Sequence, residues 1–182
     1  MNQPARFHTL GARLLTIPNI LSLLRLPLAL VFILSESAGT RALIIVAAGV
    51  SDGIDGWLAR KLQQDSGAGQ IVDPITDKLF VLVALATLTA HGLLAPWMVL
   101  ALLARDIYTS FAFFILKALN WHVHFKARML GKTATVLQLA VMIAALLWPA
   151  AVVPLLIATM LVSLVAIIDY TRVILAERGR AG

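Results

Sequence analysis

The chain has 182 residues, of which 60% are hydrophobic and only 13% are charged, and its formal net charge is +6. Soluble domains are usually about 45–50% apolar and about 25% charged, so this composition argues against a soluble domain and favours a helical membrane protein. The absence of cysteine excludes disulfides, thiolate metal sites and cysteine nucleophiles.

Six apolar segments follow one another along the chain, separated by short polar connectors. A membrane-spanning helix needs roughly 20 residues, and the first and fifth segments are near the short limit. The connectors leave no room for a soluble domain. We therefore predict an all-α integral membrane protein with a single domain over residues 1–182, built as a six-helix bundle at 17–176. The predicted spans are Pro18–Leu34, Arg41–Leu62, Ile71–Ala90, Pro96–Leu119, Gly131–Trp148 and Val152–Leu175.

Basic residues are distributed unequally between the two sides that six spans would define. One side carries Arg41 alone, and three basic residues fall within segments. Positively charged connectors face the cytoplasm, so both termini are predicted to be cytoplasmic. The net charge is then a topology signal, and we expect no nucleic-acid partner. The basic segment 1–16 suits a helix lying on anionic lipid. The side predicted to be cytoplasmic carries Arg6, Arg13, Arg60, Lys61, Lys117, Lys126, Arg128, Lys132, Arg172, Arg178 and Arg180.

Polar residues recur every three positions along one side of the first segment, at Asn19, Ser22 and Arg25. An arginine inside an apolar run needs an anionic partner, or its side chain must extend to the interface. A diphosphate or an aspartate of the acidic stretch described next would serve as that partner. The segment lacks a clear signal-peptide cleavage pattern, so we interpret it as a retained helix.

The stretch 51–78 carries five aspartates between apolar segments. Asp65 falls in a polar turn at about 63–69, where we expect a solvated loop residue. The other four form one pair spaced i, i+3 and one pair spaced i, i+4, so each pair shares a helix face. Two antiparallel helices joined by the turn would bring the pairs together. The pairs are Asp52 with Asp55 and Asp73 with Asp77.

Four clustered carboxylates near lipid are costly unless opposite charge compensates them. Hard divalent cations do so, and all-oxygen ligation suits Mg²⁺ or Mn²⁺; two ions about 3.5–4 Å apart commonly clamp a phosphoryl transfer. Gly56 and Ala59 continue the acidic face with almost no side chain, which would let a bulky ligand approach. A small cation or proton transporter is an alternative, although transporters usually hold such charges near mid-membrane.

The spacing D-x2-D-G-x2-A-R-x8-G-x3-D-x3-D resembles the signature of the CDP-alcohol phosphotransferase family of membrane enzymes. The first segment, with "IPNILSLLR", and the six-span plan extend the resemblance over most of the chain. A prenyltransferase would usually show two separate acidic motifs on different helix pairs, and the chain has one. The signature positions are filled by Asp52, Asp55, Gly56, Ala59, Arg60, Gly69, Asp73 and Asp77.

The resemblance implies attack of an alcohol on the β-phosphorus of CDP-diacylglycerol, with CMP leaving. It implies that two divalent ions, Mg²⁺ or Mn²⁺, bind to Asp52, Asp55 and Asp73, with Asp77 as general base and further ligand. It also implies a homodimer, and we expect a multi-pass protein of a bacterial inner membrane with a cytoplasmic active site. The implied nucleotide site comprises Asn19, Ser22, Arg25, Gly56, Ala59, Arg60 and Gly69.

Candidates for acceptor binding are Arg105 and Asp106 in the fourth segment and Lys132 in the fifth. Arg105 and Asp106 could equally pair with other buried charges, and Lys132 could be an ordinary cytoplasmic lysine. Both regions are similar to phosphatidylglycerophosphate synthases and cardiolipin synthases. In members that use glycerol 3-phosphate we expect a second lysine where Ala134 stands. Fewer cations suit phosphatidylglycerol, a monoanionic diester, slightly better than the glycerol 3-phosphate dianion.

Overall fold

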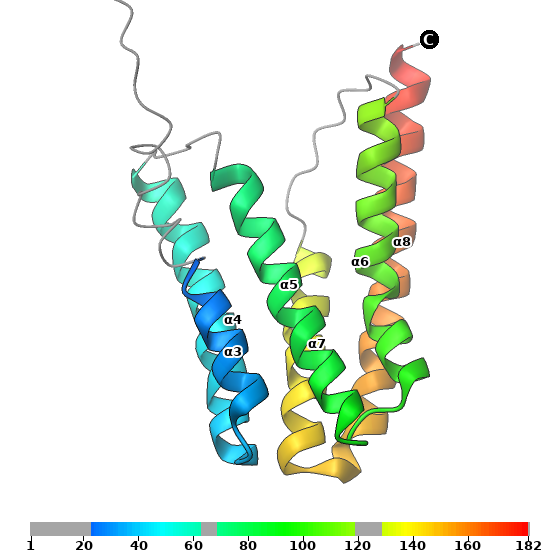
Figure 1. The fold of residues 1–182 in the computed structure, drawn as a ribbon. Helices are drawn as coiled ribbons and strands as arrows, with labels where there is room; N and C mark the ends of the chain where they lie inside the picture. The colour runs from blue at the N-terminus through cyan, green and yellow to red at the C-terminus, as the bar shows by residue number, and fades with distance from the viewer. Residues whose placement is uncertain (1–22, 63–68, 119–128, 182) are drawn as a thin grey trace, which may run out of the picture. The chain divides into compact units, whose positions relative to one another are not determined.

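The computed structural model describes residues 23–62, 69–118 and 129–181, and the regular structure in these ranges is helical (Figure 1). A helix occupies the described part of each of the six predicted segments, so the all-α prediction is confirmed there. The crossing of a membrane six times, the cytoplasmic termini and the single domain stay predictions, and the segment 1–16 lies outside the described residues. The helices are α3 (Arg25–Leu34), α4 (Ala38–Leu62), α5 (Gly69–Ala90), α6 (Pro96–Ala118), α7 (Met129–Leu147), the 3-10 helix η1 (Pro149–Ala151) and α8 (Val152–Ala181).

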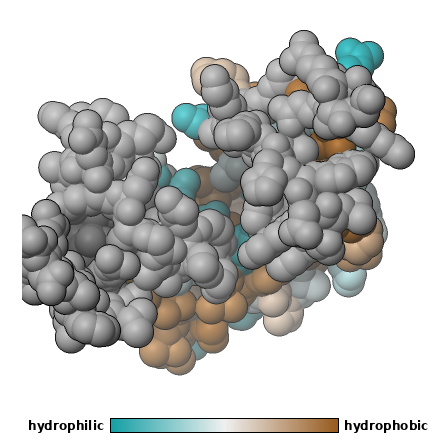
Figure 2. Space-filling view, turned by 90° about the horizontal axis from the view of Figure 1, so that it is seen from above, coloured by the Kyte–Doolittle hydropathy of each residue, from teal (hydrophilic) through white to brown (hydrophobic). Residues whose placement is uncertain are grey.

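Two stretches of the described chain are long and apolar enough to cross a membrane. They are Met129–Leu147, with a mean hydropathy of 1.8, and Pro149–Leu175, with a mean hydropathy of 2.8. Large hydrophobic side chains such as Leu43, Leu100 and Leu161 are exposed, and Figure 2 shows hydrophobic residues in brown on the outer surface. Exposed apolar surface on this scale marks a membrane or protein contact. The surface therefore supports a membrane location.

The chain groups into two compact units, residues 1–87 and 88–182. In the first unit, α3 and α4 pack together as a hairpin. Ser37 caps the start of α4, because its Oγ accepts a hydrogen bond from the backbone N–H of Thr40 at 3.4 Å. The aromatic rings of Phe32 and Phe80 meet edge to face in the core, with centroids 6.3 Å apart. These contacts tie α3 to both α4 and α5.

Arg41 is the one basic residue predicted for the non-cytoplasmic side, and it is only 4% exposed. Its Nε donates to the carbonyl of Phe32 at 3.2 Å, and a terminal nitrogen donates to the carbonyl of Ile33 at 3.5 Å. The last carbonyls of a helix lack intrahelical donors and form the negative end of its dipole. Arg41 therefore caps the C-terminal end of α3, which explains a cation at that end of the hairpin.

The α5–α6 connection turns at Gly92, whose φ is +70°. The backbone N–H of Gly92 donates to the carbonyl of Thr89, and the N–H of Leu93 donates to the carbonyl of Leu88, each at 2.9 Å. This pair of bonds is a Schellman motif, which requires a left-handed residue after the helix end. Glycine adopts that conformation without steric cost.

In the second unit, α8 packs against both α6 and α7. The hydroxyls of Tyr108 on α6 and Thr171 on α8 lie 2.5 Å apart. On α7, a Cβ added to Gly131 would lie 3.1 Å from the hydroxyl oxygen of Tyr170 on α8. A side chain at position 131 would crowd this hydroxyl, so the glycine leaves room for the Tyr170 side chain.

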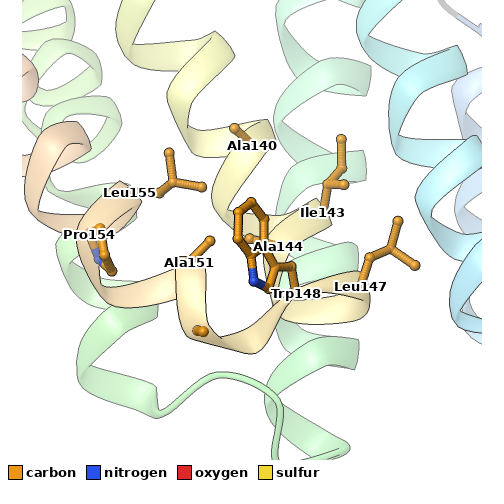
Figure 3. A pocket seen from close by; sticks show the side chains of 9 residues that line it. Ala140, Ile143, Ala144, Leu147, Trp148, Ala151, Pro154 and Leu155 are labelled. Carbon is orange, nitrogen blue, oxygen red and sulfur yellow. The ribbon is translucent and has the colours of Figure 1, made fainter.

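An apolar groove of about 680 Å³ lies where α7 turns through η1 into α8 (Figure 3). None of the candidate site residues lines it. Its surface is nearly all apolar, so it offers no groups for phosphoryl-transfer chemistry. The lining residues are Ala140, Ile143, Ala144, Leu147, Trp148, Ala150, Ala151, Pro154 and Leu155.

Candidate active site

The four aspartates lie on two uninterrupted helices of the first unit. Asp52 and Asp55 are in the second half of α4, and Asp73 and Asp77 are in the first three turns of α5. Helical geometry over each pair places its two members on one face. Gly69 is the first residue of α5. Outside the described residues are Asn19, Ser22 and Asp65, and outside the described side chains are those of Asp55, Ala59, Arg60 and Asp73.

Arg25, at the start of α3, forms an ion pair with Asp52 of α4. The guanidinium Nη2 lies 3.2 Å from the carboxylate Oδ1. The arginine side chain is 0% exposed, whereas the aspartate side chain is 52% exposed. The structure thus gives Arg25 an anionic partner of the kind that its position in an apolar run requires. The 0% exposure of Arg25 agrees with this pairing.

Around Asp77 the helix changes from buried to exposed within three residues. Thr76 is buried, with 5% exposure, Asp77 is half-buried and Lys78 is exposed. A half-buried carboxylate can meet a ligand on its open side while the helix fixes its position. This environment suits the base role that was predicted for Asp77, and that role stays a prediction.

Carboxylate oxygens are the ligands that Mg²⁺ and Mn²⁺ prefer. Asp52 fits such an ion, because its side chain is half exposed and only Oδ1 is bonded within the described part of the chain. The described side chains contain no group of three or more acids or histidines close enough to share a metal. The complete cradle of Asp52, Asp55, Asp73 and Asp77 therefore remains a prediction based on the two helix backbones.

Arg105, the first acceptor candidate, lies on α6 and bonds to residues of α7. It is 9% exposed, and its Nε donates to Oδ1 of Asp106 at 3.1 Å. A terminal nitrogen donates to the hydroxyl of Thr135 at 3.2 Å, and the other donates to the carbonyl of Gly131. The sequence left open a pairing of Arg105 and Asp106 with other buried charges; in the structure these two side chains pair with each other. The guanidinium holds the start of α7 against α6.

Lys132, the third acceptor candidate, is exposed in the first turn of α7. Ala134, where a second lysine would be expected in users of glycerol 3-phosphate, is only 2% exposed. A lysine at position 134 would therefore be buried. Sequence reasoning did not identify Thr135 as a partner of Arg105. Thr135 follows Gly131 by four residues, and its hydroxyl donates to the Gly131 carbonyl at 3.1 Å. This i, i+4 spacing is the local sequence feature that places the two Arg105 partners side by side on α7.

Residues 15–169 match the family model described as CDP-alcohol phosphatidyltransferase. The cardiolipin synthase (CMP-forming) of Streptomyces coelicolor is 45% identical over 103 residues, which cover 52% of this chain and 48% of the relative. CDP-diacylglycerol–glycerol-3-phosphate 3-phosphatidyltransferases are also similar. That of Aquifex aeolicus is 38% identical over 98 residues, covering 51% of this chain and 55% of the relative. That of Cereibacter sphaeroides is 37% identical over 105 residues, covering 52% and 48%.

The chain spans about half the length of the curated relatives that it matches. The family model, in contrast, covers most of the chain, from the first predicted span to the Asp169 position on α8. It includes the ion pair of Arg25 with Asp52, the aspartates of α4 and α5, and the acceptor candidates. The chain belongs to the CDP-alcohol phosphatidyltransferase family.

Proposed function

We propose that the protein is an enzyme of phospholipid biosynthesis that transfers the phosphatidyl group of CDP-diacylglycerol to the hydroxyl of a glycerol-type acceptor and releases CMP. The observation that carries the proposal is Asp52. It is a half-exposed carboxylate, anchored by the buried Arg25, in the helix that bears the family's acidic pattern. Family membership gives this carboxylate its chemical context.

In the proposed reaction, the acceptor hydroxyl oxygen bonds to the β-phosphorus and the bond from that phosphorus to the CMP oxygen breaks. Asp77 takes the hydroxyl proton. Divalent cations, Mg²⁺ or Mn²⁺ and by the family pattern two, would be held by Asp52, Asp55, Asp73 and Asp77 and would neutralise the diphosphate and the departing CMP. The nucleotide would be held by Asn19, Ser22, Arg25, Gly56, Ala59, Arg60 and Gly69.

Phosphatidylglycerol is slightly favoured as the acceptor, which would make cardiolipin the product. Among the three acceptor candidates, Arg105 is engaged by Asp106, Gly131 and Thr135, so Lys132 is the exposed cation. One exposed cation suits a phosphodiester monoanion better than a phosphate dianion. The 45% identity to a protein named cardiolipin synthase points the same way. Glycerol 3-phosphate is the alternative, with relatives at 38% and 37% identity.

The test is CMP release by the purified protein with CDP-diacylglycerol, Mn²⁺ and each acceptor in turn. We expect release with phosphatidylglycerol or with glycerol 3-phosphate, and the faster of the two identifies the acceptor. Absence of release with every alcohol, from protein that unfolds cooperatively and is therefore folded, would overturn the proposal. Cation flux through vesicles containing the same preparation would then favour the transporter alternative.

We further propose six membrane spans, cytoplasmic termini, an active site at the cytoplasmic face and a homodimer. The chain contains no cysteine, so single cysteines can report topology without a background. Glu36, exposed before α4, and Thr133, exposed in the first turns of α7, are predicted to lie on opposite sides. A membrane-impermeant maleimide should label Glu36→Cys in intact spheroplasts and Thr133→Cys only after permeabilisation. Labelling of both without permeabilisation would contradict the topology.

A further inference from the structure

The ion pair between Arg25 and Asp52 is unequal in its exposure to solvent. The Arg25 side chain is 0% exposed, and the Asp52 side chain is 52% exposed. A buried guanidinium strongly favours a nearby anion, because an unpaired charge out of water is costly. The Asp52 carboxylate supplies that anion, and its exposed part stays open to a further ligand.

The two oxygens of the Asp52 carboxylate are in different environments. Oδ1 faces the guanidinium at 3.2 Å. Within the described residues Oδ2 has no hydrogen bond, and the side chain has exposed surface. A carboxylate held in this way offers one fixed oxygen to an incoming cation. The arginine and a divalent ion could then share one carboxylate.

Arg41 is a second buried arginine of the same helix hairpin. The residue is 4% exposed, and its guanidinium donates to the carbonyls of Phe32 and Ile33. Arg25 contacts an aspartate of the acidic pattern. This contact points to a role of Arg25 at the acidic site.

We propose that Arg25 is a built-in counter-cation for Asp52, which neutralises this carboxylate when no divalent ion is bound and weakens the binding of that ion. The inference rests on the proposed metal site and assigns Arg25 an action through Asp52, in addition to the nucleotide contact that the family pattern implies. The charge of Arg25 would lower the electrostatic cost of an acidic cluster next to lipid in the metal-free protein. It would also keep the affinity for the divalent ion low enough for the ion to exchange.

The size of the effect follows from Coulomb repulsion. A guanidinium and a divalent ion on the two oxygens of one carboxylate would be about 6 Å apart, and at the dielectric constant of water their repulsion corresponds to about a tenfold change in affinity. Partial burial increases that figure. Removal of the Arg25 charge should therefore tighten divalent binding by about tenfold or more.

The experiment measures Mn²⁺ binding to the purified full chain by electron paramagnetic resonance, without CDP-diacylglycerol or acceptor. Arg25→Gln and Arg25→Met both remove the charge, and methionine suits a buried site if glutamine fails to fold. Each should bind Mn²⁺ about tenfold more tightly than the wild type, and Mn²⁺ should raise its melting temperature by a larger amount. Arg25→Lys keeps the charge and should stay within about threefold of the wild type.

Arg41→Gln is the matched control. It removes another buried guanidinium, which bonds to the carbonyls of Phe32 and Ile33 at the opposite end of α3, and it should leave Mn²⁺ affinity unchanged. Unchanged or weaker Mn²⁺ binding by both neutral Arg25 variants would overturn the inference, as would an equal effect of Arg41→Gln. Wild-type protein that binds no Mn²⁺ would overturn it too. Failure of the proposed transfer reaction is a separate result, because it appears as absent CMP release from protein whose Mn²⁺ binding is intact.

Discussion

Replacement of Arg105 by lysine distinguishes a structural role of this residue from an acceptor-binding role. The arginine is 9% exposed and bonds to Asp106 on its own helix and to Gly131 and Thr135 on α7. Lysine keeps the charge but lacks the planar five-donor fork, so it cannot serve three partners on two helices. The variant should therefore weaken the attachment of α7 to α6.

The expected loss is at least about 3 kcal/mol, because two hydrogen bonds from a charged donor contribute about 1.5–3 kcal/mol each and the remaining contact is retained. For a chain of this size, that lower limit corresponds to a melting temperature lower by about 6–12 °C. Thermal unfolding in detergent, followed by circular dichroism, measures it. Lys132→Met is the control, because an exposed lysine should change the melting temperature by less than about 2 °C. An unchanged melting temperature in Arg105→Lys, with a raised KM for the acceptor, would refute the structural role.

Three further predictions concern stability. Gln138 is 3% exposed, and its side-chain nitrogen has no hydrogen-bond partner among the described residues. Gln138→Met should therefore raise the free energy of unfolding by about 1–2 kcal/mol. Thr159→Val removes a hydroxyl bonded to the Leu155 carbonyl and should not raise it; an equal gain in both variants would contradict this reasoning. Gly92→Ala should destabilise by about 1 kcal/mol, because its φ is +70°. Gly53→Ala, in helix α4 with open space at the Cβ, should stabilise by up to about 1 kcal/mol, and the same sign at both glycines would contradict the conformational argument.

The positions of the helices could be predicted from the continuous apolar segments and the polar connectors between them. The start of α4 is Ala38, three residues before the apolar run at Arg41, because the Ser37 cap begins the helix in polar sequence. Helix α8 continues to Ala181, beyond the apolar limit at Leu175, because hydrophobicity reports the length of a span and helix propensity continues past it.

The site could be predicted only in part. The acidic spacing placed Asp52 and Asp55 on one helix face, and the need of Arg25 for an anion followed from its apolar surroundings. Its actual partner could not be chosen between an aspartate and a diphosphate, because the contact joins residues 27 positions apart. The partners of Arg105 on α7 are 26 and 30 positions away. Such contacts depend on how helices pack, which apolar segments and local residue spacing do not reveal.

The most direct test of the proposed reaction is metal-dependent CMP release from CDP-diacylglycerol by wild-type protein and by Asp77→Asn. The wild type should release CMP with Mn²⁺ and a glycerol-type acceptor, stop on chelation and recover when the ion is restored. Asp77→Asn should lose at least about a hundredfold in kcat, since a positioned base contributes about 10²–10⁴ in rate. Release that persists in excess chelator, or wild-type turnover by Asp77→Asn, would contradict the proposed mechanism.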